Sequence, residues 1–225
     1  MNRILEVCLV AFTLAMNLPL ATAQTPALQK GVSVQMAGSS NATPMAAADN
    51  SDAWVVTVTA DNKLYFGADL VDADGLAKEM MIHPRKREAK LYIKADARAQ
   101  FSSVEKVMKI GRKAYFESAV FLTNQNEKPA LGKMIAPQGF EVFLTAAPSN
   151  AVVIEVRNPD EPSLRINDQE VAQANLQTAL NQSLQNRGDR IVEIKAEGSI
   201  PFAQVAQLMD ACASVKAKVV IPAGE

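Results

Sequence analysis

An internal repeat with a spacing of about 100 residues limits the possible folds of this sequence more than any other feature. The segment LYIKAD at residues 91–96 is followed 101 residues later by VEIKAE at residues 192–197. Apolar residues downstream correspond at the same offset, and apolar residues upstream correspond at an offset of 100. The downstream pairs are Phe101 and Phe202, Val104 and Val205, Val107 and Leu208, and Met108 and Met209; the upstream pairs are Leu64 and Leu164, Phe66 and Ile166, Val71 and Val171, Leu76 and Leu176, and Met80 and Leu180. Matches that keep their order over such a length indicate two copies of one domain, which we place at residues 53–122 and 151–225.

Both copies show the same order of strand and helix signals. Each begins with a β-branched run, at residues 54–59 and 152–156, and a turn signal leads to a second strand at residues 64–66 or 164–166. Apolar residues at helical spacing then predict a helix, and the repeated Ile-Lys-Ala strand, a second helix and a final strand follow. The sequence therefore predicts an α+β fold made of two tandem β-β-α-β-α-β domains.

A domain of this kind places two helices on one face of a small mixed sheet and leaves the other face without cover. The second copy can cover that face, or it can extend the sheet edge to edge. Either arrangement makes an intramolecular pseudo-dimer with roughly twofold symmetry, which we expect here. The linker between the copies, residues 123–150, contains an apolar, β-forming stretch at residues 139–145 that predicts an additional strand.

The N-terminus indicates export. A short basic start precedes a largely apolar run at residues 7–20, and Ala-Thr-Ala at residues 21–23 places small residues where a signal peptidase acts. We therefore interpret residues 1–23 as a signal peptide cleaved before Gln24, and the Ala-, Ser- and Asn-rich residues 24–52 as a flexible leader. The apolar run is shorter than the roughly 20 residues of a membrane-spanning helix. The alternative is that the run is kept as a single N-terminal anchor in the inner membrane, with the rest of the chain in the periplasm.

Composition argues against several classes of function. The formal net charge is −1 and the isoelectric point is about 6.0, so we expect no nucleic-acid partner. One histidine, His83, and two cysteines, Cys8 and Cys212, leave little material for a metal centre or a Ser-His-Asp site. No glycine-rich phosphate loop or nucleophile motif occurs in the sequence. We therefore predict no catalytic residues, no metal and no cofactor, and we do not expect an enzyme.

Basic residues after the first predicted helix of each copy form a candidate interaction patch. Their ordinary interpretation is a solvated loop at a helix C-terminus, and the functional alternative is a surface for an anionic envelope polymer or an acidic partner. The patch consists of Arg85, Lys86, Arg87, Lys90, Arg187 and Arg190.

Four other chemically active residues have structural interpretations. His83 precedes a proline at the end of a predicted helix, where the helix dipole favours it. Asp96 and Glu197 end equivalent strands of the two copies, which turn chemistry explains better than acid–base catalysis. Cys212 lies on an apolar helical stripe, and we expect it to be a buried thiol.

Two longer segments carry a resemblance to a known family. Residues 91–122 and 191–222 each contain an apolar strand that ends in a small residue and an acid, followed by an aromatic residue that opens a helix. The stretch TVTADNKLYFGADLV at residues 57–71 looks like a pair of first strands with a turn between them. In these features the sequence resembles, in two copies, the periplasmic domain of the ExbD/TolR biopolymer transport family.

The resemblance implies a function in the cell envelope. In that family a single N-terminal transmembrane helix carries an aspartate that takes part in proton flow beside a partner stator protein, and the periplasmic domain dimerises and engages an envelope component or the cell wall. Residues 7–20 contain no aspartate, so the resemblance does not extend to proton conduction. It implies a periplasmic binding component of proton-motive-force-coupled transport, with partners in an ExbB/TolQ-type system or the cell wall. The alternative is a membrane-anchored component of the motor itself.

Overall fold

The computed structural model describes residues 31–83, 88–124, 135–158 and 163–224. The expected signal peptide and three residues of the basic patch, Arg85, Lys86 and Arg87, lie outside these ranges. Within the described ranges, no helix has both the length and the apolar character that crossing a membrane requires.

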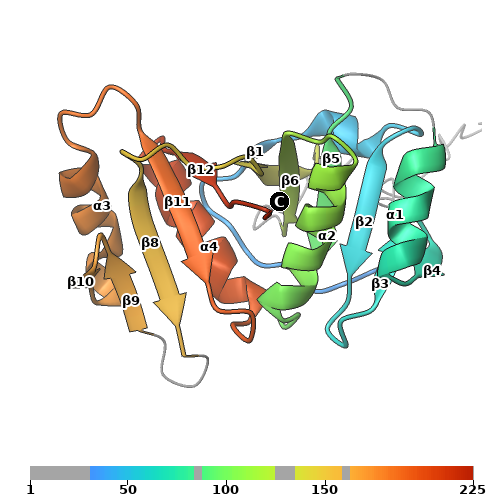
Figure 1. Ribbon diagram of the computed structural model, residues 1–225, viewed down its shortest axis with the longest axis horizontal. Helices are drawn as coiled ribbons and strands as arrows, with labels where there is room; N and C mark the ends of the chain where they lie inside the picture. Colours follow the sequence, from blue (N-terminus) through green and yellow to red (C-terminus); the bar gives the residue numbers. More distant parts are fainter. Residues whose placement is uncertain (1–30, 84–87, 125–134, 159–162, 225) are drawn as a thin grey trace, which may run out of the picture.

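Both copies contain the predicted elements in the predicted order, and each has one additional short strand (Figure 1). The added strands, β4 (Asp69–Val71) and β10 (Gln169–Glu170), turn back on β3 (Leu64–Phe66) and β9 (Ser163–Ile166). The turns need left-handed backbone, which Gly67 supplies in copy 1 with a φ of +61° and Asn167 and Asp168 supply in copy 2. Copy 1 also contains β2 (Trp54–Val58), α1 (Ala73–Ile82), β5 (Leu91–Ala95), α2 (Phe101–Lys113) and β6 (Ser118–Thr123); copy 2 contains β8 (Val152–Arg157), the short 3₁₀ helix η2 (Gln173–Asn175), α3 (Leu176–Leu184), β11 (Ile191–Ala196), α4 (Phe202–Ser214) and β12 (Lys218–Val220).

The strands of both copies form one continuous sheet. The strand order is β4-β3-β2-β5-β6 in copy 1 and β10-β9-β8-β11-β12 in copy 2, so the two copies share one topology. The linker strand β7 (Gln138–Phe143) joins them, antiparallel to β6 and parallel to β12. The additional strand expected in the linker is thus confirmed. The copies meet edge to edge, and β4 and β10 lie at opposite ends of the molecule (Figure 1).

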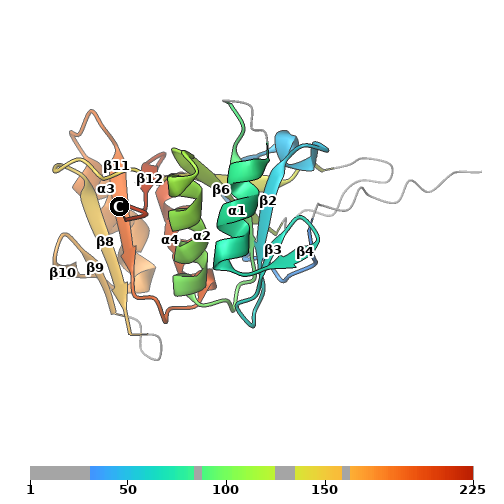
Figure 2. The same ribbon diagram turned by 45° about the vertical axis from the view of Figure 1, so that its right-hand side comes forward.

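Helices α1, α2, α3 and α4 bury apolar residues in a single core on one face of the sheet. Successive strand residues point to opposite faces, so Val56 belongs to this core whereas Val55 faces the other side. Helices α2 and α4 lie side by side at the centre of the molecule (Figures 1 and 2). Their buried faces contain the residues that correspond in the repeat, Phe101, Val104, Val107 and Met108 on α2 and Phe202, Val205, Leu208 and Met209 on α4.

Four backbone hydrogen bonds connect the loops that precede α2 and α4. They form two reciprocal pairs: for each bond from copy 1 to copy 2, the equivalent residues, 101 positions apart, make the same bond from copy 2 to copy 1. The N–H groups of Phe101 and Phe202 donate to the carbonyls of Ile200 and Ala99 at 2.9 and 2.8 Å, and those of Ser102 and Ala203 donate to Gly198 and Ala97, both at 2.9 Å. Each copy therefore presents the same backbone groups to the other.

Residues 31–53, which we call the N-terminal strap, pack on the face of the copy 1 sheet that lies opposite the helices. We call this face the outer face of copy 1. Composition predicts a flexible leader at residues 24–52. Residues 24–30 lie outside the described ranges, but the strap contains β1 (Thr43–Pro44), which pairs with β7, and the 3₁₀ helix η1 (Ala46–Asp49), so the described part of the predicted leader is folded. The strap folds here because the outer face of copy 1 is apolar and burying it is favourable. In copy 2 the residue that corresponds to Tyr92 is the charged Glu193. The cluster beneath the strap consists of Ala48, Val55, Tyr92, Val120 and Leu122.

The N-terminal strap is hydrogen-bonded to both copies. Asp96, after β5 of copy 1, accepts a hydrogen bond of 3.0 Å from the backbone N–H of Gln35. Asp210, on α4 of copy 2, accepts hydrogen bonds from the hydroxyl of Ser39 at 2.7 Å and from the backbone N–H of Asn41 at 2.9 Å. Burial raises the pKa of Asp210, but these hydrogen bonds outweigh burial and leave the pKa below its ordinary value. The strap therefore spans the junction between the copies.

Candidate binding site

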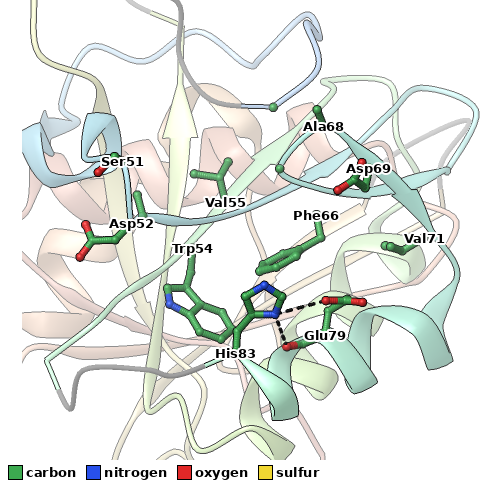
Figure 3. Close-up of a pocket in the computed structure, with 13 residues that line it drawn as sticks. Ser51, Asp52, Trp54, Val55, Phe66, Ala68, Asp69, Val71, Glu79 and His83 are labelled. Carbon is green, nitrogen blue, oxygen red and sulfur yellow. Dashed lines mark hydrogen bonds and ion pairs between the residues drawn. The ribbon is translucent and has the colours of Figure 1, made fainter.

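A cavity of about 590 Å³ opens at the outer end of copy 1, between the start of β2, the β3–β4 turn and the end of α1 (Figure 3). Three aromatic rings converge on it. The ring centroids of Trp54 and Phe66 are 5.6 Å apart, those of Phe66 and His83 are 5.5 Å apart, and those of Trp54 and His83 are 6.2 Å apart. This size lies within the range of small-ligand sites in proteins.

Packing in the core of copy 1 holds the aromatic wall in place. Trp54 is the first residue of β2, pairs with Leu91 of β5, and is only 6% exposed. Its ring meets Phe116, which is buried, at a centroid distance of 5.7 Å. Phe66 ends β3 opposite Val56 and is half-buried. The rings of Trp54 and Phe66 are therefore positioned before any ligand arrives.

His83 caps the C-terminus of α1, as its sequence position predicts. Its Nδ1 atom lies 3.0 Å from the carbonyl oxygen of Glu79 and 3.2 Å from the carboxylate oxygen Oε2 of the same residue (Figure 3). Because a carbonyl oxygen can only accept, Nδ1 carries a proton, and in the neutral ring Nε2 is then the acceptor. Figure 3 shows this second nitrogen on the side of the ring away from Glu79.

The polar residues that line the cavity are mainly acidic. Asp52, Asp69 and Glu79 contribute carboxylates, and the described lining residues include no lysine or arginine. Lys90 lines a smaller neighbouring cavity, but its ammonium is paired with Glu141 at 2.9 Å.

Copy 2 has neither the aromatic nor the acidic residues at the corresponding positions. The strand registers equate Trp54 with Val152, because these residues pair with Leu91 and Val192, and they equate Phe66 with Ile166, because these residues pair with Val56 and Ile154. At the offset of 100, His83 corresponds to Ser183, Asp69 to Gln169 and Glu79 to Ala179, and the register that equates Trp54 with Val152 equates Asp52 with Asn150. The cavity is therefore a feature of one copy, and the shared fold alone does not account for it.

The described residues of the predicted basic patch have local structural partners. Besides the Lys90–Glu141 pair, the side chain of Arg190 donates to the carbonyl of Val215 at 3.1 Å, and that of Arg187 donates to the carbonyl of Asn150. Burial raises the pKa of Glu141, but hydrogen bonds from Lys90 and Ser118 outweigh it and hold the pKa below its ordinary value. A binding role of the patch stays a prediction.

The strand-ending acids and the cysteine have the structural roles that the sequence predicted. Asp96 accepts hydrogen bonds from the backbone and side chain of Arg98, and Glu197 accepts one of 2.9 Å from the hydroxyl of Ser199. Cys212 is fully buried, and burial raises the pKa of its thiol to about 12. In the part of the chain that the structure describes, no group of three His, Cys, Asp or Glu side chains is placed to hold a metal ion.

Comparison with known proteins identifies the domain that is repeated. The family model described as biopolymer transport protein ExbD/TolR matches residues 4–126 and, a second time, residues 124–223. The first match contains copy 1, and the second covers residues 151–223 of copy 2. A search of curated proteins found no match, and neither did a search of solved structures. Because the two matches together span most of the chain, this protein belongs to the ExbD/TolR family of biopolymer transport proteins and contains two tandem copies of the family's domain.

Proposed function

We propose that this protein is a periplasmic, non-enzymatic binding component of a proton-motive-force-coupled biopolymer transport system. The observation that carries the proposal is the family match over both copies. The folded halves engage cell-envelope proteins of an ExbB/TolQ-type system, or the cell wall, and the cavity of copy 1 is a candidate contact site. In this role the chain needs no catalytic group of its own.

The two copies act as an intramolecular pseudo-dimer. Reciprocal hydrogen bonds between equivalent backbone groups, a shared apolar core and the linker strand β7 support this proposal. A covalent linker raises the effective concentration of one half near the other to about the millimolar range, so pairing does not depend on the protein concentration in the cell. The pair is thus assembled as soon as the chain folds.

Proton conduction is left to other components of the system. The apolar run at residues 7–20 contains no carboxylate and no basic residue; besides the thiol of Cys8 it offers only Thr13 and Asn17, and neither of these two titrates. Proton transfer through a bilayer core needs an ionisable group or a wet path. We therefore propose that residues 1–23 are an export signal, cleaved before Gln24, and that the protein acts from the periplasm.

A second candidate function has one observation in its favour. The first family match begins at residue 4 and so includes the apolar run. The corresponding proposal is a membrane-anchored component of the transport motor, with residues 7–20 kept as a single anchor facing the periplasm. The two candidates differ in whether the native N-terminus is needed after export.

Exchange of the N-terminus separates the two candidates. Residues 1–23 are replaced by an unrelated cleavable signal peptide, and the variant is expressed in a strain that lacks the protein. If the periplasmic proposal holds, the variant restores transport to the level of the native chain. Loss of transport, with normal amounts of folded protein in the periplasm, would support the anchored motor component instead.

A further inference from the structure

We propose that the cavity of copy 1 binds the side chain of an arginine or lysine presented by a protein partner in the cell envelope. The assignment of the partner to the envelope rests on the function proposed above. The preference for a cationic side chain rests on the cavity itself, through its aromatic wall, its acidic residues and the contrast with copy 2.

The aromatic wall suits a cation with an apolar stem. Trp54, Phe66 and His83 turn their rings toward one another around the cavity (Figure 3). The π face of tryptophan or phenylalanine attracts an ammonium or guanidinium group, and the methylene stem of lysine or arginine packs on the same apolar surface. Core packing holds the rings of Trp54 and Phe66, so binding needs little ordering of these two side chains.

The acidic residues supply charge complementarity. Asp69 is exposed at the start of β4, and Glu79 lies one helical turn before His83 with about one third of its side chain exposed. Asp52 also lines the cavity but takes part in another interaction, so Asp69 and Glu79 are the carboxylates on which the charge complementarity rests. A guanidinium or ammonium group meets acceptors here.

Copy 2 provides an internal comparison for this proposal. It has the same strand order and the same helix positions, yet valine, isoleucine and serine stand where copy 1 has tryptophan, phenylalanine and histidine. The three acidic positions are asparagine, glutamine and alanine in copy 2. Aromatic and acidic character thus differ together between two otherwise equivalent domains, as expected if one of them carries a site for a cation.

The single tryptophan of the chain makes the proposal testable by fluorescence. The full chain is titrated with the peptide acetyl-Gly-Leu-Arg-Leu-Gly-amide and with the same peptide carrying citrulline, which is uncharged and nearly isosteric with arginine. We expect a saturable change in Trp54 emission with the arginine peptide and roughly three- to tenfold weaker binding of the citrulline peptide. Raising the salt concentration is expected to weaken the binding of the arginine peptide but not that of the citrulline peptide.

Two variants test whether the arginine peptide binds in the cavity of copy 1. The double variant Asp69→Asn/Glu79→Gln removes two charges but keeps hydrogen-bonding groups. We expect it to bind the arginine peptide roughly three- to tenfold more weakly than the native chain does. The matched control is Glu170→Gln on the exposed strand β10 of copy 2, which should bind as the native chain does. Thermal unfolding of each variant shows whether it is folded. The citrulline and salt comparisons need no variant, so the proposal stays testable if the double variant is unstable.

Three results would overturn the proposal. They are equal binding of the two peptides, no change in Trp54 emission with either peptide, and preferential binding of chitotetraose, an uncharged N-acetylglucosamine oligosaccharide. The last result would make the cavity a cell-wall glycan site. These measurements use purified protein, so their failure leaves the proposed periplasmic role standing, and failure of the N-terminal exchange leaves the peptide result standing.

Discussion

Replacement of Gly139 by alanine is expected to weaken the junction between the two copies. Gly139 lies in β7, where it pairs with Leu122 of β6 and with Thr43 of β1. A Cβ atom at this position would lie 2.6 Å from the carbonyl oxygen of Phe121 and 2.9 Å from Cγ1 of Val120. The carbonyl belongs to the backbone of the neighbouring strand and cannot rotate away as a side chain could. The two strands therefore have to separate locally.

The expected loss of stability follows from two opposing effects. Overpacking of a well-packed site costs about 1–3 kcal/mol. Alanine also restricts the unfolded chain, which offsets about 0.4–1 kcal/mol of that cost. The midpoints of these two ranges give a fall in the free energy of unfolding of about 1.3 kcal/mol, which corresponds to a decrease in Tm of about 3–5 °C for a chain of this size.

Thermal unfolding followed by far-ultraviolet circular dichroism measures this change. Gly188→Ala is the matched control, because a Cβ atom at Gly188 would meet nothing within 4 Å. Its Tm should be unchanged or slightly raised. If Gly139→Ala unfolds at the temperature of the native chain, β6 and β7 are not packed as described, and the edge-to-edge arrangement of the copies is wrong.

Three further predictions concern the pH dependence, the thiol and the separate halves. Hydrogen bonds from the Arg98 side chain outweigh burial and lower the pKa of Asp96, so Asp96 contributes stability above its unfolded-state pKa that is lost as the pH falls through the folded-state pKa. Asp96→Asn should therefore reduce the fall in Tm between neutral pH and about pH 3, and an unchanged fall would contradict the assignment. In a Cys8→Ser chain, Cys212 should stay unreactive toward a thiol reagent at about pH 8 until denaturant is added, and rapid reaction of the folded protein would refute its burial. Each copy expressed alone should self-associate in sedimentation experiments, because its β6 or β12 edge loses its partner strand, and monomeric halves would count against the pseudo-dimer.

The repeat predicted most of the fold because its apolar residues serve the same core in both copies. The stripes of α2 and α4 and the strand around residues 91–95 follow directly from that correspondence. Strands β4 and β10 could not be predicted in this way, since two or three residues are too few to show a period. The edge-to-edge junction was one of two open arrangements, because the pattern of apolar residues does not say whether a sheet is covered or extended.

The amino-acid composition of the N-terminal strap does not predict its structure. Its residues are mostly small and polar, and its partners Asp96 and Asp210 lie 61 and 171 residues away from Gln35 and Ser39. Contacts at such separations leave no periodic signal in the strap itself. On the opposite face Tyr92 of copy 1 corresponds to Glu193 of copy 2, whereas Val55 and Val120 correspond to Val153 and Val220, so this face carried only a weak signal that copy 1 needs cover.

The cavity was missed for a related reason. Trp54, Phe66 and His83 belong to three different elements, and His83 alone gave only the signal of a helix terminus. A comparison of the two copies position by position contained the missing information, since aromatic residues in copy 1 stand against aliphatic or small ones in copy 2. Divergence between repeats marks a function that the shared fold does not require.

The N-terminal residue of the protein isolated from cells tests the central claim most directly. Mass spectrometry of the intact protein, combined with N-terminal sequencing, identifies that residue without any variant. The periplasmic binding component proposed here predicts a chain that begins at Gln24 and is released with the soluble periplasmic fraction. A chain that retains Met1 and sediments with the inner membrane would contradict this account and establish the apolar run at residues 7–20 as an anchor.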